Sequence, residues 1–108
     1  MSTDLSVGTA RTFTVGDLSP TPRAAVIVSA TPDGSVLYST ETEHYFGLNR
    51  TGTFIWNNLH PKCETVDEIC AAVHAEFPSG EPNQIARDVE RLLARLLEKQ
   101  LVDPRIPT

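Results

Sequence analysis

The sequence predicts an α+β domain in which a small three-stranded antiparallel sheet is followed by three α-helices. Three observations support this prediction. Extended, β-branched segments separated by turn residues occupy the first half of the chain. Helix-capping residues recur in the second half, and a leucine-rich stripe at helical spacing follows them. Because 108 residues suffice for one compact core and little more, we expect a single domain.

The strands of the predicted sheet lie before residue 49. Residues 24–28 are rich in β-branched side chains, residues 31–34 read Thr-Pro-Asp-Gly and signal a turn, and residues 35–39 resume an extended pattern. Residues 44–48 form a third strand, which can pair antiparallel with the second. Because this third strand ends the sheet, we expect one of its edges to lack a partner.

Capping residues place the first two helices. The side chain of Asn49 can accept a hydrogen bond from a free amide of the following turn, which predicts a helix over residues 49–59, ended by the His-Pro pair. Thr65 and Glu68 are three residues apart and form a capping box. The second helix is therefore predicted over residues 65–76.

The third predicted helix is the longest and begins at Pro82, a residue that suits the first helical turn. Its apolar stripe consists of Ile85, Val89, Leu92, Leu93, Leu96 and Leu97. On a helical wheel this stripe spans roughly 140°, wider than the roughly 100° that faces a core. Some apolar surface on one flank of residues 85–99 is left to contact a partner.

Composition divides the chain into three parts. Residues 1–23 are dominated by Ser, Thr, Gly and Pro and bury too little apolar area to offset their chain entropy, so we expect a flexible N-terminal arm. Residues 24–103 form the domain, and residues 104–108 form a short tail. Within the arm, Phe13 and Val15 could occupy the free strand edge when no ligand is bound.

Charge and hydropathy exclude several classes of partner. Nine Lys and Arg against fourteen Asp and Glu give a formal net charge of -5, which disfavours a nucleic-acid backbone. The longest apolar stretch, residues 24–28, is far too short for a membrane span or a secretory signal. We therefore expect a cytoplasmic protein that binds neither nucleic acid nor a membrane.

The two cysteines predict neither a disulfide nor a metal site. Cys63 and Cys70 each have a histidine nearby, but only six residues separate them, against about twelve or more in familiar zinc modules. We expect Cys70 to be buried and Cys63 to be an exposed free thiol. His60 and Cys63 could be imagined as base and nucleophile, but no third group orients them. The sequence predicts no enzyme, no metal and no cofactor.

Several motifs occur together in a fixed order, namely Tyr45-Phe46-x-Leu48-Asn49-x-Thr51-Gly52, Ile55-Trp56, Thr65-Val66-x-Glu68-Ile69, Asp88-Val89 and Leu93-x-x-Leu96-x-x-x-x-Leu101-Val102. Over about residues 24–102 this order resembles the PqqD-like family, the peptide-binding domains known as RiPP recognition elements. The resemblance implies a winged helix-turn-helix arrangement, in which the leader of a ribosomally made precursor adds a strand to the third strand and packs on the third helix. The stand-alone size resembles the recognition proteins of lasso-peptide pathways, which present the precursor to a leader-removing protease.

The resemblance and the residue pattern together predict a peptide-binding site that consists of His44, Tyr45, Phe46, Gly47, Leu48, Asp88, Val89, Arg91, Leu92, Arg95 and Leu96. Main-chain pairing along residues 44–48 would supply affinity, and side-chain pockets would supply selectivity. The competing interpretation is that the regularly spaced apolar residues in this set are simply core. The same strand edge could also pair two copies into a homodimer.

A basic stripe on the third helix leaves three uses open. It consists of Arg87, Arg91, Arg95 and Lys99, four residues apart. It could receive acidic side chains of a leader, form a solvated face paired with nearby carboxylates, or contact phosphates in a small winged-helix DNA-binding regulator. The regulator is the second hypothesis for function, and the acidic turns at residues 33–34 and 41–43 weigh against it.

Overall fold

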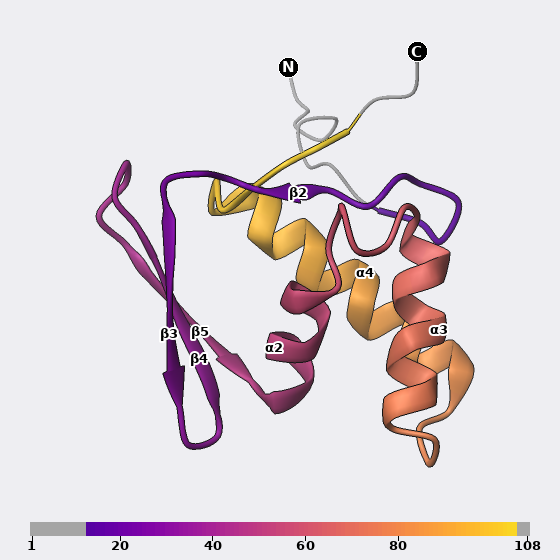
Figure 1. The fold of residues 1–108 in the computed structure, drawn as a ribbon. Coiled ribbons are helices and arrows are strands. Elements are labelled where there is room, and N and C mark those ends of the chain that lie inside the picture. The colour runs from indigo at the N-terminus through magenta and orange to yellow at the C-terminus, as the bar shows by residue number, and fades with distance from the viewer. Residues whose placement is uncertain (1–12, 106–108) are drawn as a thin grey trace, which may run out of the picture.

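The computed structural model describes residues 13–105 of the chain (Figure 1). The elements follow in the order β2 (Thr21–Pro22), β3 (Val26–Thr31), β4 (Gly34–Ser39), β5 (Tyr45–Asn49), α2 (Arg50–Asn57), α3 (Val66–Glu76), α4 (Pro82–Glu98) and β6 (Val102–Asp103). The predicted α+β fold is confirmed, with a three-stranded antiparallel sheet that precedes three helices.

The main sheet has the order β3-β4-β5, so β4 is central and β3 and β5 are edge strands (Figure 1). Both pairs are antiparallel, as predicted. Gly34 must be glycine, because a Cβ atom there would lie 2.0 Å from the carbonyl oxygen of Leu48 on β5. β5 begins and ends one residue later than the predicted strand 44–48, since Asn49 still pairs with Gly34.

Capping begins α2 and α3 where the sequence predicts it. The Asn49 side-chain oxygen accepts from the amide of Gly52 at 2.8 Å, and the Thr65 hydroxyl accepts from the amide of Glu68 at 3.1 Å. The Glu68 carboxylate in turn accepts from the amide of Glu64. α2 ends at Asn57, two residues before the predicted end, because residues 58 and 59 form a turn.

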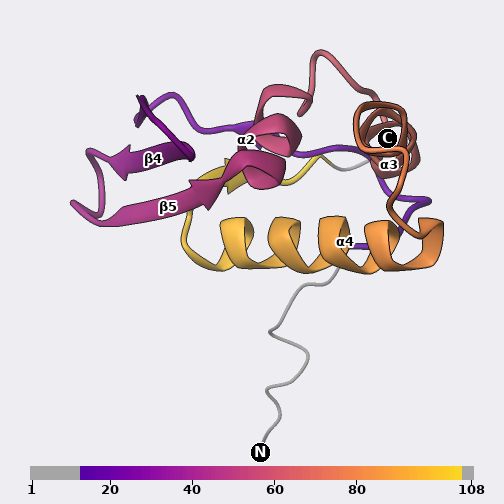
Figure 2. The same ribbon diagram turned by 90° about the horizontal axis from the view of Figure 1, so that it is seen from below.

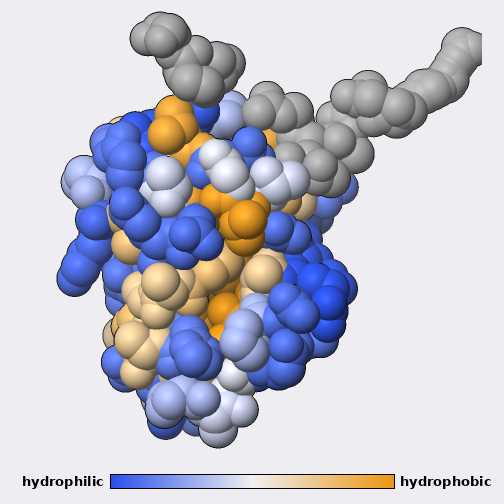
Figure 3. All heavy atoms as spheres, turned by 90° about the vertical axis from the view of Figure 1, so that its right-hand side faces the viewer, coloured by the Kyte–Doolittle hydropathy of each residue, from blue (hydrophilic) through white to orange (hydrophobic). Residues whose placement is uncertain are grey.

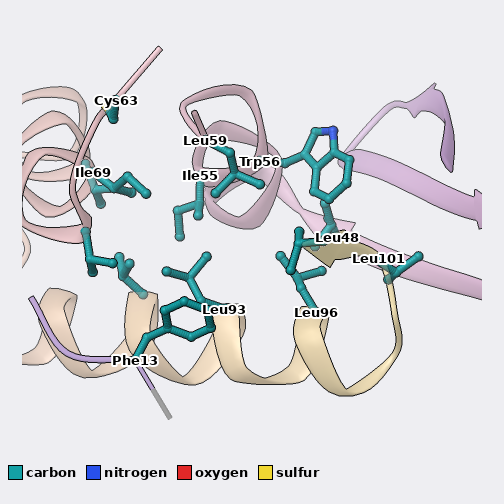
Figure 4. Packing of buried hydrophobic residues seen from close by; sticks show 14 of the residues in the cluster. Phe13, Leu48, Ile55, Trp56, Leu59, Cys63, Ile69, Leu93, Leu96 and Leu101 are labelled. Carbon is teal, nitrogen blue, oxygen red and sulfur yellow. The ribbon is translucent and has the colours of Figure 1, made fainter. Parts of the chain in front are cut away.

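α4 lies along one side of the molecule and reaches from α3 to the sheet (Figure 2). It begins at Pro82, as predicted, and the Glu81 side chain caps its first free amides. Four of its apolar residues are buried, namely Ile85, Val89, Leu93 and Leu96. They pack against apolar residues of α2, α3 and β5 in one core (Figure 4). The face on the α3 side is mostly hydrophilic, with a strip of hydrophobic side chains across its middle (Figure 3).

Residues 13–23 differ from the expected flexible arm. Phe13 lies in the core beside Leu93 (Figure 4), and β2 pairs antiparallel with β6. The burial of Phe13 and these long-range hydrogen bonds supply stabilisation that local composition does not reveal. The proposal that Phe13 and Val15 occupy a sheet edge is therefore wrong for this structure, because the Val15 carbonyl instead accepts from the amide of Asp67. Residues 1–12 of the arm and 106–108 of the tail lie outside the described part, and the domain limits stay a prediction.

Candidate functional site: a groove between β5 and α4

β5 presents an open hydrogen-bonding edge. Within residues 13–105 its only strand partner is β4, so the backbone groups on its other side have no strand to pair with. A Cβ atom at Gly47, in the middle of β5, would meet nothing within 4 Å. Such an edge can accept an additional extended strand, provided that the surface beside it suits the side chains of that strand.

The surface beside this edge is a groove of about 470 Å³. It is lined by β5, by the start of α2 and by α4, in particular by Phe46, Gly47, Leu48, Asn49, Thr51, Gly52, Ile55, Asp88, Leu92 and Arg95. Local sequence explains how these three elements meet. Asn49 is both the last residue of β5 and the cap of α2, so the strand passes into the helix without a loop.

An aromatic ring and a cation form one end of the groove. The guanidinium carbon of Arg95 on α4 lies 5.0 Å from the centroid of the Phe46 ring on β5. This contact joins the two walls and restricts the positions that both side chains can take. Leu92, one helical turn before Arg95, is half-buried and packs against the core, which leaves part of its side chain in the groove.

A carboxylate is placed two helical turns before Arg95. Asp88 accepts a hydrogen bond from the side-chain amide of Gln84 at 2.8 Å, and its Oδ1 lies 3.7 Å from a guanidinium nitrogen of Arg91. Asp88 and Arg91 are both exposed, so their attraction is weak. The groove therefore combines apolar side chains with one negative and one positive group.

The structure brings together six of the eleven predicted site residues, namely Phe46, Gly47, Leu48, Asp88, Leu92 and Arg95. Val89 and Leu96 are fully buried, and Leu48, which also lines the groove, is only 7% exposed, so the core interpretation is correct for these three residues. Tyr45 points away from the groove, is 73% exposed, and packs its ring 4.7 Å from that of Tyr38. His44 and Arg91 are exposed and do not line the groove.

Four groove residues were missed by the sequence-based list of site residues, namely Asn49, Thr51, Gly52 and Ile55. Asn49, Thr51 and Gly52 lie at the strand-to-helix junction, and Ile55 lies one helical turn further along α2. A signal for them was present, because the motif Asn49-x-Thr51-Gly52 directly follows the predicted docking strand. The register of α2 relative to α4, which turns these residues toward the groove, depends on tertiary packing.

The basic stripe does not form one uniform surface. Arg91 is paired with Asp88, and Arg87 donates a hydrogen bond to the side-chain oxygen of Gln84. The β3–β4 turn carries Asp33, and the turn before β5 carries Glu41, whose carboxylate pairs with Arg23 at 2.9 Å. A wing with these acidic turns is unsuited to a phosphate backbone.

The cysteine thiols lie outside the groove lining and are poor nucleophiles. Cys63 is buried, so the expectation of an exposed thiol is wrong, and burial raises its pKa. Cys70 is half-buried, and burial followed by the nearby charges of Asp67 and Glu90 raises its pKa to about 11. Both thiols therefore stay protonated near neutral pH.

Two further findings concern the whole described part of the chain. Residues 13–105 bring no three His, Cys, Asp or Glu side chains into a group that could hold a metal ion. Within the same residues, every helix is too short or too polar to cross a membrane.

Comparisons with known proteins place this chain in a family. Residues 34–102 match the family model of coenzyme PQQ synthesis protein D, PqqD. The chain is also similar to a solved structure of TbiB1 in complex with the TbiA(beta) leader peptide, with 30% sequence identity and a TM-score of 0.70. That similarity covers 81% of this chain and 99% of the TbiB1 chain. A search of curated proteins found no match. By the extent of these matches, the chain belongs to the PqqD family.

Proposed function

We propose that this chain is a non-catalytic RiPP recognition element, which binds the leader of a ribosomally made precursor peptide by strand addition to β5. The observation that carries the proposal is the groove between an open strand edge and α4. The similarity of the chain to TbiB1, whose structure was solved in complex with a leader peptide, supports a leader peptide as the ligand.

The physical chemistry of the groove supports an extended peptide as its ligand. A peptide strand laid along β5 would pair with backbone donors and acceptors that otherwise bond to water. Its alternate side chains would reach the groove, where Phe46, Leu48 and Leu92 offer apolar contacts. Main-chain pairing would supply affinity for any extended segment, so selectivity depends on these side chains.

We further propose that the chain presents the bound leader to a processing enzyme, namely the leader protease of a lasso-type pathway. Binding would hold the flexible precursor near that enzyme and raise its effective concentration there. This role needs no catalytic group in the chain, which fits the high pKa values of its two thiols. It would take place in the cytoplasm, where ribosomal precursors are made.

A titration tests the binding step. The gene neighbourhood is first searched for a short precursor reading frame. A fluorescein-labelled leader from that precursor is then titrated with the protein at 50 and 300 mM salt, in parallel with a labelled DNA duplex. We expect saturable peptide binding that weakens with salt far less than binding to phosphates does, because backbone pairing and apolar contacts supply most of the affinity. Saturable binding of the duplex that weakens steeply with salt, without peptide binding, would instead support the DNA-binding regulator.

The edge of β5 could also pair with a second copy of the chain, and we propose that such a homodimer competes with the leader. Sedimentation velocity of the protein alone and with saturating leader measures this competition. We expect any dimer to dissociate when the leader binds, because both need the same backbone groups. A dimer that persists with bound leader would place the contact between copies elsewhere.

A further inference from the structure

We propose that the groove selects its peptide by charge: Arg95 binds an acidic side chain beside Phe46, and Asp88 favours a basic side chain nearer the N-terminal end of α4. This inference rests on the proposed function, because it assumes that an extended peptide lies along β5. It adds the chemistry of the ligand, which neither strand addition nor apolar contact specifies.

Arg95 is a cation without an acidic partner among residues 13–105. No carboxylate of these residues lies within 4.0 Å of its guanidinium, whereas Arg23 and Arg105, which hold β2 and β6 in place, both form ion pairs. The Phe46 ring nevertheless fixes Arg95 at the groove. A stacked guanidinium keeps its N–H donors free at the edge of its plane, where a carboxylate can accept two of them.

Asp88 and Arg95 place a negative and a positive charge at different positions along the groove. Asp88 and Arg95 are seven residues apart on α4, which corresponds to about 10.5 Å along the helix axis. α4 runs opposite to β5 (Figure 2). Arg95 lies over the Phe46 ring on β5, and Asp88 lies two helical turns nearer the N-terminal end of α4. An extended peptide advances about 3.4 Å per residue, so the two charges span about three of its residues.

The two charges should therefore fix both the register and the direction of the peptide. A carboxylate beside Arg95 is attracted, and the same carboxylate beside Asp88 is repelled. A peptide that is shifted or reversed along β5 keeps its backbone pairing but loses this match. The expected ligand is an extended segment with apolar side chains and an acidic and a basic residue two or four positions apart, because only alternate side chains of a strand face the groove.

Selection from a displayed library of random twelve-residue peptides tests this inference without knowledge of the natural leader. The library is selected against the full chain and against Arg95→Glu, Asp88→Lys and Arg87→Glu. Arg87→Glu is the matched control, because it makes the same charge change on an exposed site of α4 outside the groove lining. Circular dichroism checks that each variant is folded.

We expect the unmodified chain to enrich peptides that carry the predicted pair of charges, always in the same order. Arg95→Glu should bind such a peptide at least tenfold more weakly, and replacing the acidic residue of the peptide by Lys should restore binding. Arg87→Glu should select the same peptides as the unmodified chain. Asp88→Lys should exchange the preferred basic residue for an acidic one.

Two failures can be told apart. Enriched peptides that share apolar residues but no charges, or that bind Arg95→Glu as tightly as the unmodified chain, would overturn the charge selection and leave peptide binding intact. A library from which the unmodified chain enriches nothing would count against peptide binding itself, and the charge selection would fall with it.

Discussion

The strongest test of the groove is the substitution Leu92→Asp. Leu92 is half-buried on α4, faces the groove and packs against the core with only part of its side chain. Replacing it by Asp should therefore leave the domain folded and place a charge on the surface that receives the peptide. We expect the variant to bind the leader much more weakly.

The size of the effect follows from the burial of Leu92. Burying a whole leucine side chain contributes about 1.5–3 kcal/mol, and at most about a third of the surface of Leu92 remains to be covered by a peptide. The loss of that contact costs roughly 0.5–1 kcal/mol. Desolvating a carboxylate beside Asp88 adds to this cost. A total of at least about 1.4 kcal/mol corresponds to a tenfold increase in Kd.

The assay is fluorescence anisotropy of the labelled leader, with thermal melting followed by circular dichroism as the test of folding. Ile27→Asp is the matched control, because Ile27 is 54% exposed on the opposite edge strand, β3. It introduces the same side chain away from the groove and should leave the Kd unchanged. Leu93→Asp, at a fully buried neighbour, should prevent folding. A folded Leu92→Asp variant with unaltered affinity would refute the groove as the binding surface.

Three further predictions concern folding and the thiols. In melting experiments Gly34→Ala should lower Tm sharply, because its Cβ would clash with the Leu48 carbonyl oxygen. Gly47→Ala should leave Tm nearly unchanged, because a Cβ atom there meets nothing within 4 Å. Thr65→Ala should reduce the free energy of unfolding in urea by about 1 kcal/mol, and an unchanged midpoint would contradict the cap. Iodoacetamide should alkylate Cys70 in the folded protein faster as pH rises toward 11, and a rate that levels off below pH 9 would contradict its raised pKa.

The raised pKa of Cys70 also predicts how stability depends on pH. The folded state favours the protonated thiol, so the unfolded chain releases this proton at lower pH than the folded chain does. The contribution of Cys70 is therefore fully present below the thiol pKa of the unfolded chain and is lost as pH rises toward 11. Urea denaturation of the protein and of Cys70→Ala between pH 8 and 11 measures it, and parallel curves would contradict the assignment.

Local chemistry explains why most of the fold was predictable. Asn49 and Thr65 start helices because their side chains accept hydrogen bonds from nearby backbone amides, and Pro82 starts one because its φ angle is fixed. Such short-range effects can be predicted from the sequence. The order of strands and helices follows the same signals. By contrast, the folded segment 13–23 depends on Phe13 reaching α4 and on β2 pairing with β6, contacts between residues far apart in the chain.

The sequence by itself determined the elements, the open edge of the third strand and the apolar excess on the last helix, because these follow from propensity, periodicity and strand order. Only the tertiary structure decided which apolar residues belong to the groove. It buried Val89 and Leu96 and left Leu92 and Arg95 at the surface. Helical spacing defines a stripe, but the angle at which α4 packs on its neighbours decides which edge of that stripe is covered.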